Sequence, residues 1–399
     1  MTSKTYGLTE QQLAYNEAIN RYLDRPSEAA LNSLKASHLE NKIGSSSLIQ
    51  DIAKRHFSDK HASKPMRERT VTIDAETKVF LRGIDHTSRQ KGLPNLGNTC
   101  WGNSTLQAFV LSNPEVKRLL TTPLEKRASE SSDDFEARKE LQGNLKALND
   151  EYAKPDRNQS RITELLTQVW TSDIIVSSRL RPMEKQEDAP EFLGLILETL
   201  DADKSGRVSF EERSVIDVTG KNTTNHKSDS TNQIIKAKGL GTNPTIQKTV
   251  DQMFTTETLS DYKHEDKVTP ATKRIYYRTV NDGAAPASLA VQLPRFAFDG
   301  TGKKVTTPIK GFDQEIKVPF HDDKGNLVKH GVYQVDSVVL HLGSTLQSGH
   351  YITLLRTDSG WEERNDSFVR SISTEEAHRM MENQGYLVRM TCVREEAAH

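Results

Sequence analysis

Apolar residues recur at helical spacing in the first half of the chain and form strand-like runs in the second half. Residues 1–89 are mostly polar, with short helical patterns such as Tyr15, Ile19 and Tyr22, so we expect a helical accessory region that ends in a linker. Downstream, helical patterns separated by prolines predict helices at 103–110, 134–151, 162–170 and 187–200. This part of the chain should form an α-rich lobe.

Beyond residue 247, β-branched and aromatic residues dominate. They predict strands at 274–280, 288–298, 316–320, 333–340, 350–356, 361–365 and 385–393. The intervening residues 222–243 are rich in Thr, Asn, Ser and Lys and have little to bury, so we expect a mobile insertion there. Helices followed by a sheet indicate the α+β class.

Composition restricts the environment and the partners of the 399-residue chain. Its 54 Lys and Arg nearly balance its 55 Asp and Glu, which gives no reason to expect nucleic acid or a membrane surface as a partner. Cys100 and Cys392 are the only cysteines, which excludes a disulfide framework and a four-cysteine zinc site. There is no signal-peptide pattern and no apolar run of roughly 18 residues. We therefore expect an intracellular, cytosolic protein.

Cys100 is the candidate nucleophile. It follows a turn-rich segment, residues 92–100 (GLPNLGNTC), and opens a helix that carries Leu106 and Val110 on one face. Unpaired backbone N–H groups and the helix dipole favour a thiolate at such a position. An isolated cysteine is more often a buried structural residue, and Cys392, inside an apolar strand, fits that alternative.

His350 is the candidate base. It begins a predicted strand, and the chain returns after a turn at 358–360 along a strand that ends at Asn365. Two antiparallel strands joined in this way bring Asn365 beside His350. The amide oxygen can then hold one imidazole N–H and fix the tautomer whose other nitrogen takes the thiol proton. The chain has 12 histidines, so the setting of His350 matters more than its residue type.

Four segments in the right order resemble the catalytic domain of the ubiquitin-specific proteases. They are residues 92–100, 186–193 (QEDAPEFL), 289–296 (LAVQLPRF) and 333–369, and the resemblance covers about residues 90–396. Four segments in register are far more specific than any one of them. The resemblance implies a papain-like cysteine protease with a helical thumb that carries Cys100, a β-sheet palm that carries His350, and fingers that grip ubiquitin.

The resemblance also implies the catalytic roles. Cys100 corresponds to the nucleophile, His350 to the general base and then acid, Asn365 to the third member of the triad, and Asp366 to a helper. Asn95 corresponds to the side-chain donor of the oxyanion hole, which works with the backbone N–H of Cys100. Such a donor contributes about 3 to 4 kcal/mol to lowering the barrier, so losing Asn95 should reduce turnover more than binding.

A route for the C-terminal tail of ubiquitin follows from the same resemblance. The residues placed along it are Gln186, Asp188, Glu191, His341, Gly349 and Tyr351. Asp188 and Glu191 correspond to the acidic residues that bind arginines near the ubiquitin C-terminus. Alternatively, the helix dipole alone favours carboxylates in a first helical turn. Tyr351, Gly349 and His341 correspond to walls of a channel that admits only the two terminal glycines.

The sequence departs from the family pattern in the fingers and after the nucleophile. The family's fingers usually carry two cysteine pairs that bind zinc, whereas residues 250–286 contain no cysteine, so we expect no zinc and reduced fingers. Gly102 lies where a bulky residue is usual. It should weaken its helix by about 1 kcal/mol relative to alanine.

Residues 201–212 (DADKSGRVSFEE) match the pattern of an EF-hand calcium loop. The predicted calcium ligands are Asp201, Asp203, Ser205, Arg207 through its carbonyl, Ser209 and Glu212. The alternative is that the match is accidental, because the exit segment is short and β-branched and no partner loop is present. The sequence leaves both alternatives open.

The expected function is that of a thiol-dependent deubiquitinase, which hydrolyses the isopeptide bond after the C-terminal glycine of ubiquitin. We expect a monomer that acts on ubiquitin and ubiquitinated proteins and needs no cofactor for catalysis. One alternative is a protease for another ubiquitin-like modifier, which the missing zinc pairs keep open. Another is a non-catalytic ubiquitin-binding scaffold. If the protein is a bacterial effector, the expected location is the host cytosol.

Overall fold

The computed structural model describes residues 18, 22, 30, 32–34, 91–182, 184–218, 225–264, 267–296, 302–346 and 348–398. The described residues before residue 91 are helical, and the other predictions for residues 1–89 lie outside the described part. Within these ranges, no helix has the length and apolar character needed to cross a membrane.

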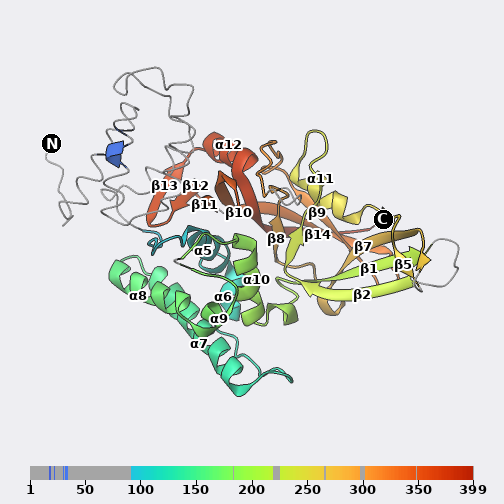
Figure 1. The fold of residues 1–399 in the computed structure, drawn as a ribbon, viewed down its shortest axis with the longest axis horizontal. Helices are drawn as coiled ribbons and strands as arrows, with labels where there is room; N and C mark the ends of the chain where they lie inside the picture. Colours follow the sequence, from blue (N-terminus) through green and yellow to red (C-terminus); the bar gives the residue numbers. More distant parts are fainter. Residues whose placement is uncertain are drawn as a thin grey trace.

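The helical lobe, or thumb, packs against one side of a central sheet (Figure 1). It contains α5 (Cys100–Thr105) with a π-helical continuation (Leu106–Val110), α6 (Pro114–Leu119), α7 (Ser132–Tyr152), α8 (Gln159–Trp170), α9 (Asp173–Ser177) and α10 (Ala189–Thr199). Helix α8 illustrates why these segments form packed helices. Its residues at positions i, i+3, i+4 and i+7 form one buried face, namely Ile162, Leu165, Leu166 and Val169. The predicted helices therefore exist, with ends shifted by a few residues.

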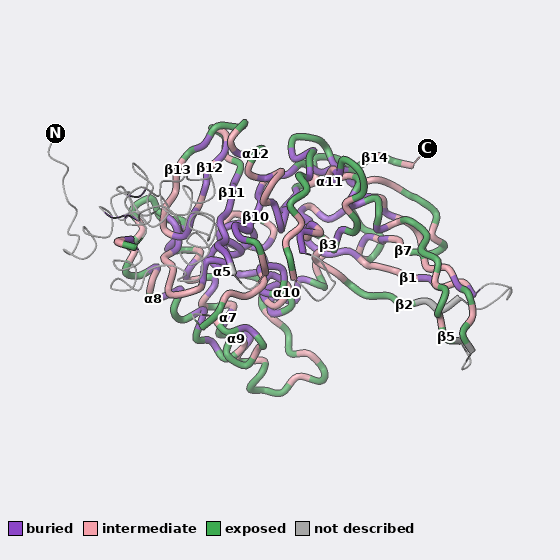
Figure 2. Tube along the Cα trace, turned by 45° about the horizontal axis from the view of Figure 1, so that its top comes forward, coloured by how far each residue is buried: buried purple, intermediate pink, exposed green. Residues whose placement is uncertain are grey.

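The palm is an eight-stranded sheet in the order β13-β12-β11-β10-β14-β8-β3, with β9 paired to β10. Its strands are β3 (Ile234–Lys236), β8 (Ser288–Gln292), β9 (Ile316–His321), β10 (Leu327–Thr345), β11 (Ser348–Thr357), β12 (Gly360–Asn365), β13 (Phe368–Ile372) and β14 (Gly385–Ala397). Among the strand pairs of this sheet that the described residues form, β3–β8 is the parallel one, and the others are antiparallel. The middle of β10 and the start of β11 are buried, and α5 of the thumb contacts β11 (Figure 2).

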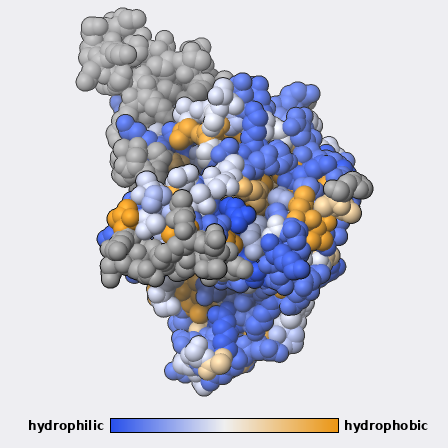
Figure 3. Space-filling view, turned by 90° about the vertical axis from the view of Figure 1, so that its right-hand side faces the viewer, coloured by the Kyte–Doolittle hydropathy of each residue, from blue (hydrophilic) through white to orange (hydrophobic). Residues whose placement is uncertain are grey.

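The fingers are long strands that extend away from the helices (Figure 1). They form a sheet in the order β2 (Asn225–Asn232), β1 (Phe210–Val218), β7 (Ala271–Thr279), β4 (Glu257–Leu259), with a small β5 (Lys263–His264) and β6 (Lys267–Val268) pair; α11 (Ile246–Asp251) lies nearby. Cross-strand ion pairs join Arg213 to Asp229 and Arg278 to Glu211. The end face of the molecule is accordingly mostly hydrophilic, with small separate hydrophobic patches (Figure 3).

The structure differs from the sequence predictions in several places. Residues 225–236, inside the segment predicted to be a mobile insertion, form β2 and β3, because pairing with β1 and β8 satisfies backbone groups that the polar side chains do not specify. Helix α12 (Thr374–Gln384) was not predicted. At position 102 packing leaves room only for glycine, because a Cβ atom there would lie 2.2 Å from the Trp170 ring.

Candidate active site

Cys100 is the first residue of α5 and is only 1% exposed. The loop before it is shaped by two residues with positive φ, Gly97 and Asn98. The side chain of Asn95 organises this loop, because its Oδ1 accepts hydrogen bonds from the backbone N–H groups of Gly97 (3.0 Å) and Thr99 (3.2 Å). The local sequence therefore fixes the position of the thiol at the helix N-terminus.

An aromatic cluster holds α5 in the thumb. The Trp101 ring centroid lies 5.6 Å from that of Trp170 and 5.2 Å from that of Phe192 on α10. The opposite face of α5 contacts β11, where the Thr353 hydroxyl donates to the Ser104 carbonyl (2.8 Å). The nucleophile is thus located where the thumb meets the palm.

His350 lies on β11 directly opposite Leu342 of β10 and is 1% exposed. Its Nε2 is 2.6 Å from Oδ1 of Asn365, the last residue of β12, which leaves Nδ1 for the thiol. Burial alone would lower the pKa of His350, but the charge and hydrogen bond of Cys100, followed by Asp366 and Asn365, raise it to about 9. The hairpin geometry expected from the sequence is present.

Asp366 lies next to the imidazole of His350. Its carboxylate accepts hydrogen bonds from Nδ2 of Asn95 (2.9 Å) and Nδ2 of Asn103 (2.8 Å), and it lies 4.0 Å from Nε2 of His350. Burial raises the pKa of Asp366, although His350 and the two amides oppose that shift. Gly92 has no room for a side chain, because a Cβ atom would lie 2.0 Å from the Asp366 carbonyl oxygen. Asp366 therefore links the nucleophile loop to the base.

Gln186 contacts the sulfur directly. Its Nε2 lies 3.6 Å from Sγ of Cys100, and its Oε1 is buried without a hydrogen-bond partner. The sequence predicted this residue as a substrate contact but gave no sign of a contact with the nucleophile. An amide N–H beside the sulfur stabilises negative charge there.

His341, Gly349 and Tyr351 form a buried cluster beside His350, on β10 and β11. His341 and Tyr351 are paired across β10 and β11, and their rings meet edge to face with centroids 4.7 Å apart. A Cβ atom on Gly349 would lie 2.3 Å from the Leu342 carbonyl oxygen and 2.8 Å from Nε2 of His341. Burial lowers the pKa of His341 far below its usual value, so the ring is neutral. The three predicted channel residues are therefore adjacent in space.

Asp188 and Glu191 lie at the start of α10. Asp188 is the N-cap residue and accepts a hydrogen bond from the Tyr386 hydroxyl (2.8 Å). Burial raises the pKa of Asp188 to about 6, against the opposing effect of that hydrogen bond. Glu191 is exposed and lines an open groove of about 400 Å³ between α10 and the β2–β3 segment, where Lys236 forms part of the opposite wall.

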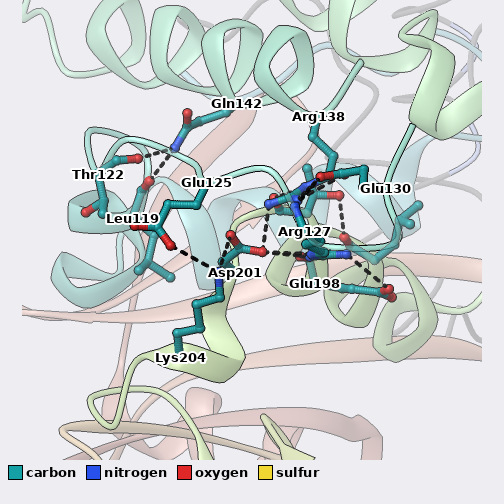
Figure 4. A network of polar contacts seen from close by, with 12 residues as sticks. Leu119, Thr122, Glu125, Arg127, Glu130, Arg138, Gln142, Glu198, Asp201 and Lys204 are labelled. Carbon is teal, nitrogen blue, oxygen red and sulfur yellow. Dashed lines mark hydrogen bonds and ion pairs between the residues drawn. The ribbon is translucent and has the colours of Figure 1, made fainter. Parts of the chain in front are cut away.

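The predicted calcium loop has a different structure from an EF-hand. Oδ1 of Asp201 is bound by Arg127 (2.8 Å) and Arg138 (2.7 Å), and Lys204 also contacts its carboxylate (Figure 4). Arg138 additionally pairs with Glu130 (3.0 Å). These contacts join the segment before α7 to the end of α10. The first predicted calcium ligand is therefore engaged by arginine side chains.

The other predicted calcium ligands are not directed at a common point. The Arg207 carbonyl accepts a hydrogen bond from the Ser288 N–H (3.0 Å). The hydroxyl of Ser209 donates to the Ala202 carbonyl, and Glu212 lies on β1 opposite Tyr277. The Ser205 carbonyl accepts backbone hydrogen bonds, and Asp203 is exposed. The described ranges contain no group of three or more Asp, Glu, His or Cys arranged to hold a metal ion. A strand replaces the exit helix, so the EF-hand prediction fails as a geometry.

Two residues of the site escaped the sequence interpretation. Tyr386, the second residue of β14, contacts Asp188, and Asn103, one helical turn after Cys100, binds Asp366. Tyr386 carried no sequence signal, because its contact crosses from the palm to the thumb. The i to i+3 spacing of Asn103 from Cys100 places both on one helix face, which was the available hint.

A thiol, an imidazole and an amide that meet where a helical lobe contacts an antiparallel sheet define the papain-like class. The sequence matches the family model described as "Ubiquitin carboxyl-terminal hydrolase" over residues 91–388. The chain therefore belongs to the ubiquitin carboxyl-terminal hydrolase family, and the resemblance to ubiquitin-specific proteases is confirmed.

Curated relatives share this family name. The chain is 27% identical over 315 residues to "Ubiquitin carboxyl-terminal hydrolase 36" of Drosophila melanogaster, which covers 71% of the chain and 28% of the relative. It is 24% identical to "Probable ubiquitin carboxyl-terminal hydrolase 16" of Schizosaccharomyces pombe, covering 78% of the chain and 69% of the relative. The chain thus spans less than a third of the length of the Drosophila protein.

Solved structures with the same fold include the SAGA Ubp8/Sgf11/Sus1/Sgf73 DUB module bound to ubiquitin aldehyde. The TM-score is 0.58 at 21% identity, and the match covers 88% of this chain and 77% of that chain. A yeast SAGA DUB module with a Sgf73 mutant matches with a TM-score of 0.56 at 20% identity, over 88% of this chain and 76% of that chain. The α+β, papain-like fold predicted from the sequence is confirmed.

Proposed function

We propose that this protein is a cysteine deubiquitinase that hydrolyses the bond after the C-terminal glycine of ubiquitin. The observation that carries the proposal is the meeting of Cys100, His350 and Asn365 next to the closely packed residues His341, Gly349 and Tyr351. Gly349 leaves no space for even a Cβ atom of its own, and such close packing beside His350 suits a substrate tail without side chains. A diglycine tail has that property.

The reaction follows from the geometry. Nδ1 of His350 takes the thiol proton, and the thiolate of Cys100 attacks the carbonyl carbon of the terminal glycine. The carbonyl oxygen becomes an oxyanion, toward which the backbone N–H of Cys100 and an N–H of Asn95 donate. Collapse breaks the bond to the lysine nitrogen, which leaves with the proton from His350. Water, deprotonated by His350, then hydrolyses the thioester and frees ubiquitin.

Each supporting residue has a defined task in this scheme. Asn365 holds Nε2 of His350, and Asp366 holds the amides of Asn95 and Asn103. Because one N–H of the Asn95 amide is bound to Asp366, the orientation of its second N–H is set. Gln186 donates toward the sulfur and stabilises the thiolate.

Asp188 and Glu191 bind arginines of the ubiquitin tail in this proposal. Both residues lie at the start of α10, and Glu191 lines the open groove. Charge-assisted bonds from guanidinium groups suit partly buried carboxylates. Thiolate and imidazole supply both the nucleophile and the proton transfers, so the catalytic scheme contains no cofactor, and calcium is not part of it.

The decisive experiment is intact-mass analysis after mixing the full chain with a ubiquitin probe that carries a C-terminal electrophile. Wild type should gain one ubiquitin and should also cleave a fluorogenic ubiquitin substrate, whereas Cys100→Ala should do neither. A folded wild type that stays unlabelled and inert would overturn the proposal.

The same experiment separates the two rival functions. If probes built on SUMO or another ubiquitin-like modifier label Cys100 and the ubiquitin probe does not, the protein is a cysteine protease for that modifier and not for ubiquitin. If no probe labels the protein but ubiquitin binds to wild type and Cys100→Ala equally, the domain is a binding scaffold. The contact among Cys100, His350 and Asn365 argues for turnover.

A further inference from the structure

The backbone around Tyr386 is held by an unusual buried arginine. Arg295 is fully buried, and its side chain donates to the carbonyls of Gly385 (2.8 Å), Thr307 (2.6 Å) and Glu382. Burial alone lowers the pKa of Arg295 to about 10. The Leu293 N–H also donates to the Tyr386 carbonyl (2.8 Å). The first two residues of β14, Gly385 and Tyr386, are thus both held through their backbone carbonyls.

The Tyr386 ring is part of the aromatic cluster that contains His341 and Tyr351. It meets Phe296 edge to face at 5.1 Å, Phe296 meets His341 in the same manner at 5.1 Å, and His341 meets Tyr351 at 4.7 Å. Tyr386 itself is 2% exposed. A ring packed in this way cannot turn away, so the direction of its hydroxyl group is set by the palm.

The hydroxyl group bridges the two lobes. It donates to Oδ1 of Asp188 on the thumb (2.8 Å) and accepts from Nε2 of Gln292 on β8 (3.0 Å). With the proton of Tyr386 committed to Asp188 and its oxygen occupied by Gln292, this hydroxyl has one defined orientation. A carboxylate has acceptor sites for more than one donor, so Asp188 retains capacity for a guanidinium.

We propose that Tyr386 is a positioning residue that aims the Asp188 carboxylate at the arginine nearest the diglycine of the ubiquitin tail. The inference rests on the proposed function. Tyr386 touches neither the scissile bond nor the arginine. It acts through Asp188 by fixing one carboxylate oxygen, so that the other faces the incoming guanidinium.

The electrostatics of Asp188 agree with this role. Burial and the nearby Glu191 of α10 raise its pKa, whereas the Tyr386 hydroxyl and Lys236 of β3 lower it, and the result is about 6. Burial, followed by the charge of Asp188, raises the pKa of Tyr351 on β11. Removing the Tyr386 hydroxyl would therefore raise the pKa of Asp188 further and reduce the ionised fraction that can bind arginine.

The test compares Tyr386→Phe with wild type in the full chain, using ubiquitin substrate. Because a hydrogen bond to a charged group is lost while the ring remains, KM should rise about tenfold and kcat should change little. The matched control is Tyr333→Phe, which removes a buried hydroxyl bound to the Pro286 carbonyl (2.9 Å) in the palm. That variant should lose stability without a change in KM.

Two further measurements distinguish positioning from a general structural role. With ubiquitin whose arginine nearest the diglycine is replaced by alanine, Tyr386→Phe should have no further effect on KM. In a Cys100→Ala background, ubiquitin affinity should increase as the pH rises through about 6, where Asp188 ionises, and Tyr386→Phe should move this increase to higher pH. Gln292→Met, which leaves the tyrosine in place, should give a smaller shift in the same direction.

The failures of the two proposals are distinguishable. If wild type neither binds nor cleaves ubiquitin, the proposed function is wrong, and the role of Tyr386 that depends on it is wrong as well. If wild type cleaves ubiquitin but Tyr386→Phe raises KM equally for the normal and arginine-lacking substrates, the positioning role is overturned. An unchanged pH profile in both Tyr386→Phe and Gln292→Met would overturn it as well.

Discussion

The junction at Cys100 and the loop at residues 201–212 each match a known local pattern, yet the fold completes only one of them. At the junction, partners from α5, β11 and β12 converge within hydrogen-bond distance. In the loop, Arg127 and Arg138 of the thumb bind Asp201, the first predicted ligand. The last predicted ligand, Glu212, lies on strand β1. A motif therefore predicts chemistry only when distant parts of the chain supply its remaining partners.

Replacing the nucleophile has the largest expected effect. Cys100→Ala should lower kcat/KM for a ubiquitin substrate by roughly 10⁴-fold or more, because members of a catalytic triad act as one unit. Steady-state kinetics measure the change, and a thermal unfolding scan checks the fold. Residual activity within tenfold of wild type would mean that this junction is not the catalytic centre.

Removing the predicted oxyanion donor should come next. Asn95→Ala should lower kcat by about 10² to 10³-fold, since the donor acts on charge that develops in the transition state. KM should change much less, which a titration of ubiquitin onto the Cys100→Ala and Cys100→Ala/Asn95→Ala proteins can verify. An equal loss in binding would instead assign Asn95 to substrate recognition or loop structure.

Substitutions in the loop at residues 201–212 should affect stability and not catalysis. Asp201→Asn should destabilise the fold by about 3 kcal/mol, because Arg138 is buried and loses one of its two carboxylate partners. Chemical denaturation measures this effect. Asp203→Asn is the matched control: Asp203 is the exposed third position of the same pattern and should cost almost nothing. Equal losses at both positions would favour the calcium alternative.

The coupling inside the junction can be read from a titration. Cys100 supplies the largest contributions that raise the pKa of His350 to about 9, while burial acts to lower it. Cys100→Ala should therefore lower the pKa of His350, as followed by NMR of the ring. His321, whose pKa burial lowers and whose Nδ1 lies 3.3 Å from the Tyr277 carbonyl, should titrate as before. An unchanged pKa of His350 in Cys100→Ala would contradict the pairing of the thiol with the imidazole.

Calcium should have the smallest effect. Because arginines bind Asp201 and Glu212 lies on β1, millimolar calcium or a chelator should leave both the unfolding midpoint and the cleavage rate unchanged. Differential scanning calorimetry with and without calcium provides the measurement. A rise of several degrees that Asp203→Asn abolishes would show that the loop binds the ion after all.

Much of the fold could be predicted from pattern alone. The 3.6-residue periodicity identified α7, α8 and α10, and β-branched runs identified β9, β11 and β12, with errors of a few residues at the ends. Polar β2 was missed because a strand at the edge of a sheet needs backbone pairing more than apolar side chains. Helix α12 was missed because it buries only Ala377 and Met381.

The sequence by itself determined the nucleophile loop, since Gly97, Asn98 and the Asn95 side chain act within a few residues of Cys100. It also determined the pairing of His350 with Asn365, because a single hairpin joins them. Only the tertiary structure decided that Gln186 reaches the sulfur, that Tyr386 reaches Asp188, and that Asp201 is bound by Arg127 and Arg138. These contacts join different elements, and their geometry depends on how the two lobes pack.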